Sequence, residues 1–389
     1  MRELSSSAVD ELIATRRDLH RHPEVAFNET RTAAIVSRRL RALGLRVREG
    51  VGRTGVVADL SGGGRGPNLV LRAEMDALPL QEAEGSEFRS TRSRVMHACG
   101  HDGHTAMLLC VASELARSGR VEGLVRFVFQ PAEEIGAGAQ AMLEDGTLDG
   151  ADWDGAFAIH IRPFMTVGSI GICRGAATAK VGEFEMSVTG TGGHGGRPHV
   201  STDALLAAVE IVSALQTLVP REVSAFDSAV MSVCSFHAGA AANVIPEVAR
   251  LAGTIRSVSD DVYEHLFSRI DEMASAIGNG FRCQVRVRRR EMMPAVRNHP
   301  RMARLAREAA VAVVGTDQVL EVEPVMAGDD VALFFERIPG CYLFLGAAHD
   351  DGRTPSANHS PEWDFDERAL VIGASVLLEA VDRFMTQPE

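Results

Sequence analysis

The chain has 389 residues and a formal net charge of −12 at pH 7. Single hydrophobic cores usually split at this length, so two domains are expected. The negative charge disfavours binding to nucleic acid and to anionic membrane surfaces. No apolar run approaches the ~20 residues that a membrane helix needs. These features predict a soluble protein with no nucleic-acid or membrane partner.

The residues at 1–24 predict an amphipathic helix and lack the apolar core of a secretory signal. The six cysteines show no CxxC pairing, and most lie in apolar segments, as is typical of buried thiols in a reducing compartment. We therefore expect a cytoplasmic protein.

Apolar periodicity in the first half of the chain predicts helices that alternate with strands. The expected helices lie at about 8–20, at 30–43, from about 103 and at 138–145, and the expected strands at about 54–60, 68–76, 124–130 and 155–161. Strands separated by helices imply a largely parallel sheet covered on both faces. Ligands of such sheets bind beyond the carboxyl ends of the strands.

The pattern changes from about Val181. Strands are expected at 181–190, 228–236, 247–256 and 281–290, with helices at 202–219 and 260–278. This β-α-β-β-α-β order is the split βαβ arrangement of a ferredoxin-like domain. A strand at 341–348 and a helix at about 366–385 then return to the strand and helix pattern of the first half of the chain. We predict an α/β protein whose mixed, mostly parallel domain (1–180 and 293–389) is interrupted by a ferredoxin-like α+β domain (181–292).

The segment MHACGHDGHTAML begins the helix expected from about residue 103. Cys99 and His101 offer a thiolate and an imidazole at this junction between loop and helix, where both side chains can point at one metal ion. His97 and His104 do not obviously join them. The alternative is a helix start with a buried thiol and capping polar groups.

Glu133 and Glu134 follow the strand at 124–130. Adjacent carboxylates repel each other unless a positive charge lies nearby. A metal hydrolase needs one carboxylate as a ligand and a second as a base that takes a proton from water. The alternative is a solvated helix start, because acidic residues favour helix N-termini.

Three further candidates lie at strand ends or in loops. His160 ends an apolar strand, where a lone histidine is more often a core residue than a ligand, and His359 lies in a polar loop. Asp76 follows a buried strand and could accept the second ring N–H of a ligating histidine, although a simple turn explains it equally well. Together with the earlier donors, these residues suit two divalent ions with Glu133 as the base.

The ordered set RAEMDALP, MHACGHDGH, QPAEE, IHIRP, GGHGGRPH, NVIP, GTIR and HSP resembles the M20 metallopeptidase superfamily. It is most similar to the amidohydrolase branch, which contains hippurate hydrolases, auxin-conjugate hydrolases and N-acyl-amino-acid deacylases. The resemblance covers nearly the whole chain. The ordered set is specific, whereas its short pieces are not.

The resemblance implies a bimetallic catalytic domain and an inserted lid domain that also dimerises. The implied metal ligands are Cys99, His101, Glu134, His160 and His359. Cys99 would occupy the bridging place where many relatives use a carboxylate, and Glu133 would be the general base. His194 matches a lid histidine that reaches the partner subunit's active site and polarises the scissile carbonyl.

Asn243 and Arg256 match positions that hold the substrate's carbonyl or carboxylate. An arginine at a strand end can grip a carboxylate bidentately, although a surface salt bridge is the alternative. The chain departs from the usual family pattern at Asp329, Asp330 and Val331, which is expected to alter the acyl pocket. It also departs at Glu74, whose longer side chain is expected to disturb the packing behind the ligands.

The leading functional prediction is a cytoplasmic, homodimeric amidohydrolase that cleaves N-acyl amino acids with two divalent ions, Zn, Mn, Co or Ni. One alternative is a dipeptidase or aminopeptidase of the same superfamily. Another is a relative that binds a metal or ligand without turnover. The sequence favours neither alternative, because the Cys99 and His101 pair suits the amidohydrolase branch and the base Glu133 is present.

Overall fold

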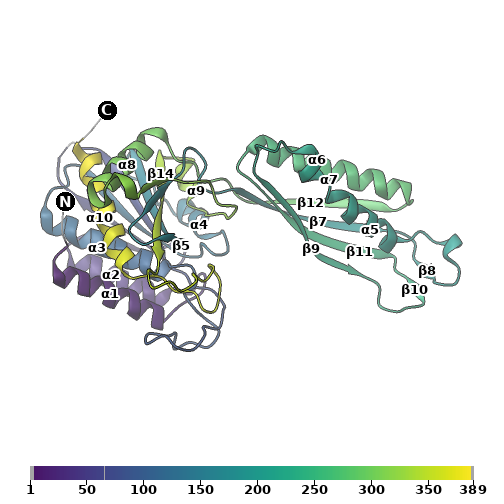
Figure 1. Cartoon of the computed structure of the whole chain (residues 1–389), viewed down its shortest axis with the longest axis horizontal. Coiled ribbons are helices and arrows are strands. Elements are labelled where there is room, and N and C mark those ends of the chain that lie inside the picture. Colours follow the sequence, from purple (N-terminus) through teal and green to yellow (C-terminus); the bar gives the residue numbers. More distant parts are fainter. Residues whose placement is uncertain (1–3, 65, 387–389) are drawn as a thin grey trace. The chain divides into compact units, whose positions relative to one another are not determined.

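The computed structural model describes residues 4–64 and 66–386, which fold into two compact units (Figure 1). The first unit consists of Met1–Ala177, Val296–Glu323 and Asp329–Glu389. The second unit consists of Thr178–Ala295 and Pro324–Gly328. Each unit has its own buried hydrophobic core.

The first unit is built on an eight-stranded sheet with the order β1-β2-β4-β3-β5-β14-β6-β13. The strands are β1 (Arg46–Val51), β2 (Gly55–Ser61), β3 (Asn68–Glu74), β4 (Leu124–Gln130), β5 (Gly155–Thr166), β6 (Ile170–Ile172), β13 (Val319–Glu321) and β14 (Gly340–Ala348). The central strands β4, β3, β5 and β14 are parallel. Strand β1 pairs antiparallel with β2, β2 with β4, and β6 with β14.

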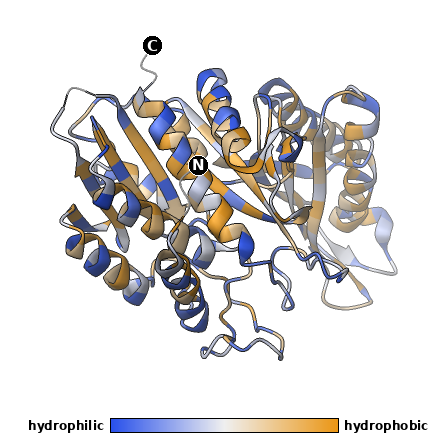
Figure 2. Cartoon of the chain, turned by 60° about the vertical axis from the view of Figure 1, so that its left-hand side comes forward, coloured by the Kyte–Doolittle hydropathy of each residue, from blue (hydrophilic) through white to orange (hydrophobic). Residues whose placement is uncertain are grey.

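Seven helices flank this sheet among the described residues. They are α1 (Ser6–Arg21), α2 (Thr30–Ala42), α3 (His101–Ser118), α4 (Gly138–Glu144), α8 (Pro300–Val314), α9 (Ala332–Phe335) and α10 (Arg368–Thr386), and a 3-10 turn covers Thr316–Gln318. Leu69, Leu71 and Ala73 of β3 pack in the main core with α3, whereas Val70 and Arg72 point to the opposite face and are also buried. Figure 2 shows the hydrophobic residues along the sheet and on the inner sides of the helices.

The topology brings several strand ends to one edge of the sheet. Because β3, β4 and β5 run parallel, the segments that follow Glu74 and Gln130 leave the sheet at the same edge, near His160 of β5. Parallel sheets place their ligand sites at this edge. The fold therefore brings together the three segments that contain Asp76, the pair of glutamates and His160.

The second unit has a four-stranded antiparallel sheet with the order β12-β7-β11-β9. Its elements are β7 (Lys180–Thr189), β8 (Gly193–His194), a 3-10 turn (Pro198–Val200), α5 (Ala204–Leu215), α6 (Leu218–Glu222), β9 (Ala229–Ala238), β10 (Val244–Ile245), β11 (Val248–Ser257), α7 (Asp260–Gly280) and β12 (Gln284–Met293). The small strands β8 and β10 pair separately.

One face of this sheet is covered by helices and the other face is open. Phe184, Met186 and Val188 of β7 are buried against the helices, whereas the alternate residues Glu185 and Ser187 point away. Both long helices begin at side-chain caps, since Asp203 accepts from Leu206 N and Ser259 accepts from Val262 N. A sheet with one apolar and one polar face is typical of antiparallel packing.

The predicted α/β class with a largely parallel sheet is confirmed, and most predicted elements are present. The predicted helix at 202–219 is divided into α5 and α6, and the sequence analysis missed α8 and the short strands β1, β6 and β13. Within the described residues, no helix is long and apolar enough to span a membrane.

Candidate metal centre

The N-terminus of α3 fixes the positions of Cys99 and His101. Gly100 caps this helix with a φ of 94°, a conformation that side chains other than glycine rarely adopt. A Cβ atom at this position would lie 3.2 Å from Trp363 and 3.3 Å from Ile161. Glycine is therefore favoured by the backbone angle, and a Cβ atom would also crowd Trp363 and Ile161.

The predicted ligand atoms lie close together. The donor atoms of Cys99, Glu134 and His359 are within 4.8 Å of one another. Nε2 of His359 is 3.3 Å from Oε2 of Glu134, and Sγ of Cys99 is 3.6 Å from Nε2 of His160. The structure thus brings together donors from the start of α3, the loop after β4, strand β5 and the loop before α10.

His101 completes this donor set. Its Nε2 lies 4.0 Å from Oε1 of Glu134 and 3.8 Å from Oε2 of Glu133. His101 Nε2 and Glu134 Oε1 are buried and have no hydrogen-bond partner among the described residues. Buried polar atoms are rarely left unsatisfied, so these two atoms fit the role of metal ligands. A set of thiolate, imidazole and carboxylate donors suits a divalent transition metal.

Backbone contacts orient the histidine rings. Nδ1 of His101 donates to the carbonyl oxygen of Asp76 at 2.9 Å, and Oδ1 of Asp76 is 3.3 Å away. Nδ1 of His160 donates to the carbonyl oxygen of Ile161 at 2.8 Å. Burial, together with His104, lowers the pKa of His160 to about 3 and keeps the ring neutral. Because each ring donates from Nδ1, Nε2 is the atom that each ring turns toward the centre.

Two residues at the centre have unusual backbone angles. Ala132, which precedes the glutamate pair, has a φ of 52°, and His359 has a φ of 66°. Such angles are uncommon outside glycine and are held by surrounding contacts. Ala132 N donates to Glu29 at 2.9 Å, and His359 N donates to the carbonyl oxygen of Ala98 at 2.8 Å. These contacts fix two of the loops that present ligands.

A buried arginine, Arg72, lies behind the centre. Its guanidinium donates to Asp329 at 2.9 Å and to Asp330 at 3.3 Å, and it also pairs with Glu74. Its Nε donates to Gln130 at 2.8 Å. Three carboxylates are therefore held by one cation that is only 4% exposed. This network was not predicted from the sequence, although a charged residue within a buried apolar strand is a signal for it.

Glu133 lies between this network and the ligands. Donor atoms of Glu133, Asp329 and Asp330 are within 4.8 Å of one another. Burial and the charge of Asp329 raise the pKa of Glu133. Asp329 and Asp330 contact buried polar groups of the first unit, since Tyr342 donates to Asp329 at 2.8 Å and Ala139 N donates to Asp330 at 2.9 Å. The expectation that these residues alter an acyl pocket stays untested.

Glu74 does not disturb the packing behind the ligands, and that expectation was wrong. Its carboxylate is 1% exposed and accepts from Nδ1 of His104 at 2.9 Å. Nε2 of His104 in turn accepts from the backbone N–H of Ile161 at 3.0 Å. Because the carbonyl of Ile161 orients His160, Glu74 and His104 form a relay that supports a predicted ligand.

The other predicted site residues lie in the second unit. His194 and Asn243 are neighbours, because Gly195 N donates to the carbonyl oxygen of Asn243 at 2.8 Å. Both residues are exposed. Arg256 is on the open face of the sheet, where its Nη1 donates to Thr254 at 3.2 Å.

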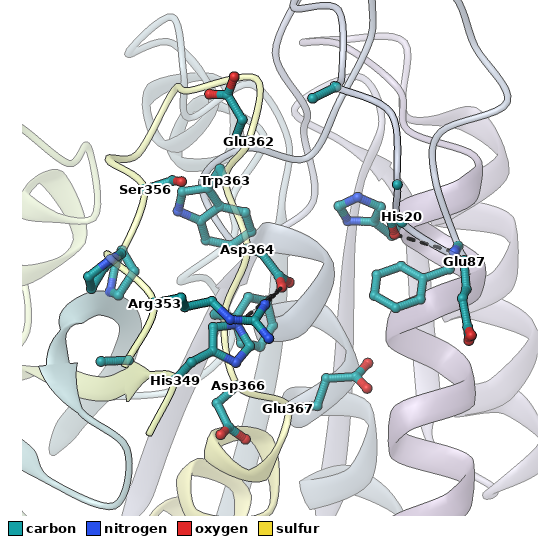
Figure 3. A pocket seen from close by; sticks show the side chains of 18 of the residues that line it. His20, Glu87, His349, Arg353, Ser356, Glu362, Trp363, Asp364, Asp366 and Glu367 are labelled. Carbon is teal, nitrogen blue, oxygen red and sulfur yellow. Dashed lines mark hydrogen bonds and ion pairs between the residues drawn. The ribbon is translucent and has the colours of Figure 1, made fainter. Parts of the chain in front are cut away.

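A wide cleft of about 900 Å³ also lies in the first unit, beside α1 and the segment 349–368 (Figure 3). None of the predicted ligands lines it. Asp364 on its wall is already paired with His349 at 3.1 Å and with Arg353 at 3.6 Å. Its wall includes Trp363, which packs against the start of α3. The cleft therefore lies next to the candidate metal centre but contributes none of its predicted ligand atoms.

Comparison with known proteins agrees with this geometry. Residues 70–383 match the model of peptidase family M20/M25/M40. The chain belongs to this family. It is 35% identical over 385 residues to N-acetyl-L-cysteine deacetylase of Bacillus subtilis. The aligned region covers 99% of this chain and 90% of that protein. It is 34% identical to hippurate hydrolase of Campylobacter jejuni, over 92% of this chain and 93% of that protein.

A solved M20 structure is also similar. The YXEP protein of Bacillus subtilis, described as a dinuclear metal binding peptidase from the M20 family, superimposes with a TM-score of 0.87 at 32% identity. The match covers 99% of this chain and all of that chain. The M20 fold of this chain is therefore established over nearly its full length.

Replacing Arg72 is expected to destabilise the first unit. The change Arg72→Met leaves three buried carboxylates without their cation, and the free energy of unfolding should fall by about 3–5 kcal/mol. Urea denaturation of the metal-free protein measures this change. The control Arg304→Met removes an exposed ion pair with Glu308 and should cost less than about 0.5 kcal/mol. A loss in Arg72→Met no larger than in the control would contradict the assigned role.

Removing His104 is expected to weaken metal binding. His104→Leu leaves the N–H of Ile161 without an acceptor and loosens His160, so metal affinity should fall by about 10–100-fold. Competition with a chromophoric chelator measures the affinity directly. The control is His97→Leu, because His97 is equally buried but neither of its ring nitrogens has a partner in the described structure. Equal affinity in both variants would rule out the relay.

Proposed function

We propose that this M20 protein is a metal-dependent amidohydrolase that cleaves N-acyl amino acids to a carboxylate and an amine. The observation that carries the proposal is the convergence of five donor residues with Glu133, whose Oε2 lies 3.8 Å from Nε2 of His101. Relatives at 34–35% identity are named as a deacetylase and a hippurate hydrolase. Both names describe hydrolysis of an acylated amino acid.

We assign the ligands of two divalent ions to Cys99, His101, Glu134, His160 and His359. The bound ions would supply Lewis acidity, which polarises an amide carbonyl and lowers the pKa of water. Zn, Mn, Co and Ni all accept this mixture of donors, so the metal is set by availability as well as by the site. Asn358 supports the assignment of Cys99, because its side-chain amide donates to Sγ at 3.3 Å.

The catalytic steps of the chain itself belong to Glu133 and the groups around it. Glu133 takes a proton from the attacking water and delivers it to the leaving nitrogen. Asp76 orients His101 through its carbonyl oxygen and also accepts from Glu134 N at 3.0 Å through its carboxylate. Asp76 therefore links a proposed ligand on α3 to the loop that holds Glu133.

The second unit is proposed to act as a ferredoxin-like lid of residues 181–292 that binds substrate. Its strand order β12-β7-β11-β9 with two covering helices supports this assignment. His194 would stabilise the oxyanion, and Asn243 and Arg256 would hold the substrate's carbonyl or carboxylate. The pairing of β8 with β10 supports a joint role, because it places His194 beside Val244, the neighbour of Asn243.

We also propose that the protein is a cytoplasmic homodimer formed through this lid. Strand β9 is an edge of the sheet, and unpaired edges are sites of strand addition. Leu206 and Val209 of α5 and Phe236 of β9 are large apolar residues that are at least 39% exposed on this side. A second copy would cover them and continue the sheet.

Glu133→Gln should retain metal content and lose turnover. The amide keeps the shape of the side chain but cannot accept the proton, so kcat should fall by at least ~100-fold. Amine release from a panel of N-acyl amino acids and metal analysis by elemental mass spectrometry give the two readouts. Glu144→Gln on α4, an exposed carboxylate, serves as the matched control. Unchanged kcat in Glu133→Gln would exclude Glu133 as the base. Faster amine release by the wild type from free dipeptides than from N-acyl amino acids would favour a peptidase.

Substitutions that place charged residues on the lid surface test the proposed dimer. The double change Val209→Glu and Phe236→Glu should convert the protein to a monomer, because two buried charges per copy would oppose the interface. Sedimentation velocity at micromolar concentration measures the change. Leu320→Glu is the control, since Leu320 is 41% exposed in the first unit. A wild-type monomer, or a double variant that remains dimeric, would refute this interface.

A further inference from the structure

Basic side chains gather on the open face of the sheet in the second unit. The pairing registers place Arg286 opposite Ser187, Ser187 opposite Arg250, and Arg250 opposite His237. These four residues therefore form one row across strands β12, β7, β11 and β9. Cross-strand neighbours are about 4.8 Å apart, so the two arginines flank the serine at a separation of about 10 Å.

The adjacent row of residues lines a hollow together with the first row. It contains Arg288, Glu185, Ala252 and Ser235 in the same strand order. The two rows line a hollow of about 520 Å³, which is within the range of small-molecule sites. Arg250, Arg286 and Arg288 are among the residues that line it, together with polar residues of the open face.

The arginines of the hollow lack partners within the protein. Across residues 4–64 and 66–386, Arg250, Arg286 and Arg288 make no ion pair and no side-chain hydrogen bond. The next arginine on the same face, Arg290, pairs with Glu183 at 3.3 Å. Three unpaired cations around one acidic residue, Glu185, repel one another, and an anion between them would remove this repulsion.

We propose that this hollow is a binding site for the phosphoryl group of a small molecule. Guanidinium forks bind phosphate oxygens in bidentate fashion, and arginine side chains are long enough for Arg250 and Arg286 to converge on one group above Ser187. The serine hydroxyl and His237 add further donors. A doubly charged phosphoryl group satisfies more of these donors than a single carboxylate does.

The hollow differs in chemistry from a nucleic-acid site and in position from the proposed substrate contacts. The residues that line it include no Phe, Tyr or Trp on which a base could stack. Arg256 lies on the same face of β11, but six residues beyond Arg250, which corresponds to about 20 Å along a strand. The site is therefore separate from Arg256 and does not depend on the proposed hydrolytic activity.

The experiment is a calorimetric titration of pyrophosphate into the full chain, after dialysis against a chelator so that no metal ion binds the phosphate. The wild type should bind one pyrophosphate, and Arg250→Gln combined with Arg286→Gln should weaken binding at least ~10-fold. The control Arg290→Gln removes another exposed arginine of the same sheet face, from the strand that holds Arg286, and should bind as the wild type does. These residues are exposed, so circular dichroism should be unchanged in all three proteins.

Citrate provides the second arm of the titration. Binding of citrate at least ~10-fold weaker than pyrophosphate supports a site for phosphoryl groups. Equal binding of citrate and pyrophosphate would overturn the phosphoryl assignment. Absence of pyrophosphate binding by the wild type, or equal affinity in the double variant, would overturn the site itself. Hydrolysis of N-acyl amino acids should be the same in all three proteins, which separates this result from the test of Glu133.

Discussion

The buried charge of Arg72 is the constraint on which the candidate centre depends. Its guanidinium holds Glu74, Asp329 and Asp330, which come from a strand and from a segment more than 250 positions later in the chain. Burying these carboxylates in low-dielectric surroundings without the cation, or the cation without them, is costly. The network therefore stabilises the end of β3, at the edge of the sheet that the parallel strands define.

The Arg72 network is connected to the proposed ligands and base through two sets of contacts. On one side, Glu74 holds His104, which holds the backbone that orients His160. On the other side, Asp329 and Asp330 lie against Glu133, the neighbour of the proposed ligand Glu134. A single cation thus supports a proposed imidazole ligand and the proposed base through separate contacts. This arrangement explains how donors from four separate segments converge without one continuous motif.

The sequence predicted residues that the fold brings close together, but not the contacts that support them. Cys99, His101 and Glu134 could be proposed as ligands because their side chains are metal donors and lie just beyond predictable strands and helices. Arg72 was missed because its partners at 329 and 330 are remote in sequence, and only the folded sheet brings them together. Helix α8 was overlooked although Pro300 opens it. The unpaired arginines of β11 and β12 became apparent only from strand register, since pattern alone does not say which strands are neighbours.

The most direct test of the proposed two-metal centre is an anomalous difference map from crystals of the zinc-loaded protein, recorded at the zinc edge. Two peaks are expected in each chain, with Sγ of Cys99 at about 2.3 Å and the nitrogens of His101, His160 and His359 at about 2.0–2.1 Å from a metal. Both peaks should also lie near the carboxylate of Glu134. A single peak, or peaks away from these five residues, would contradict the proposed centre.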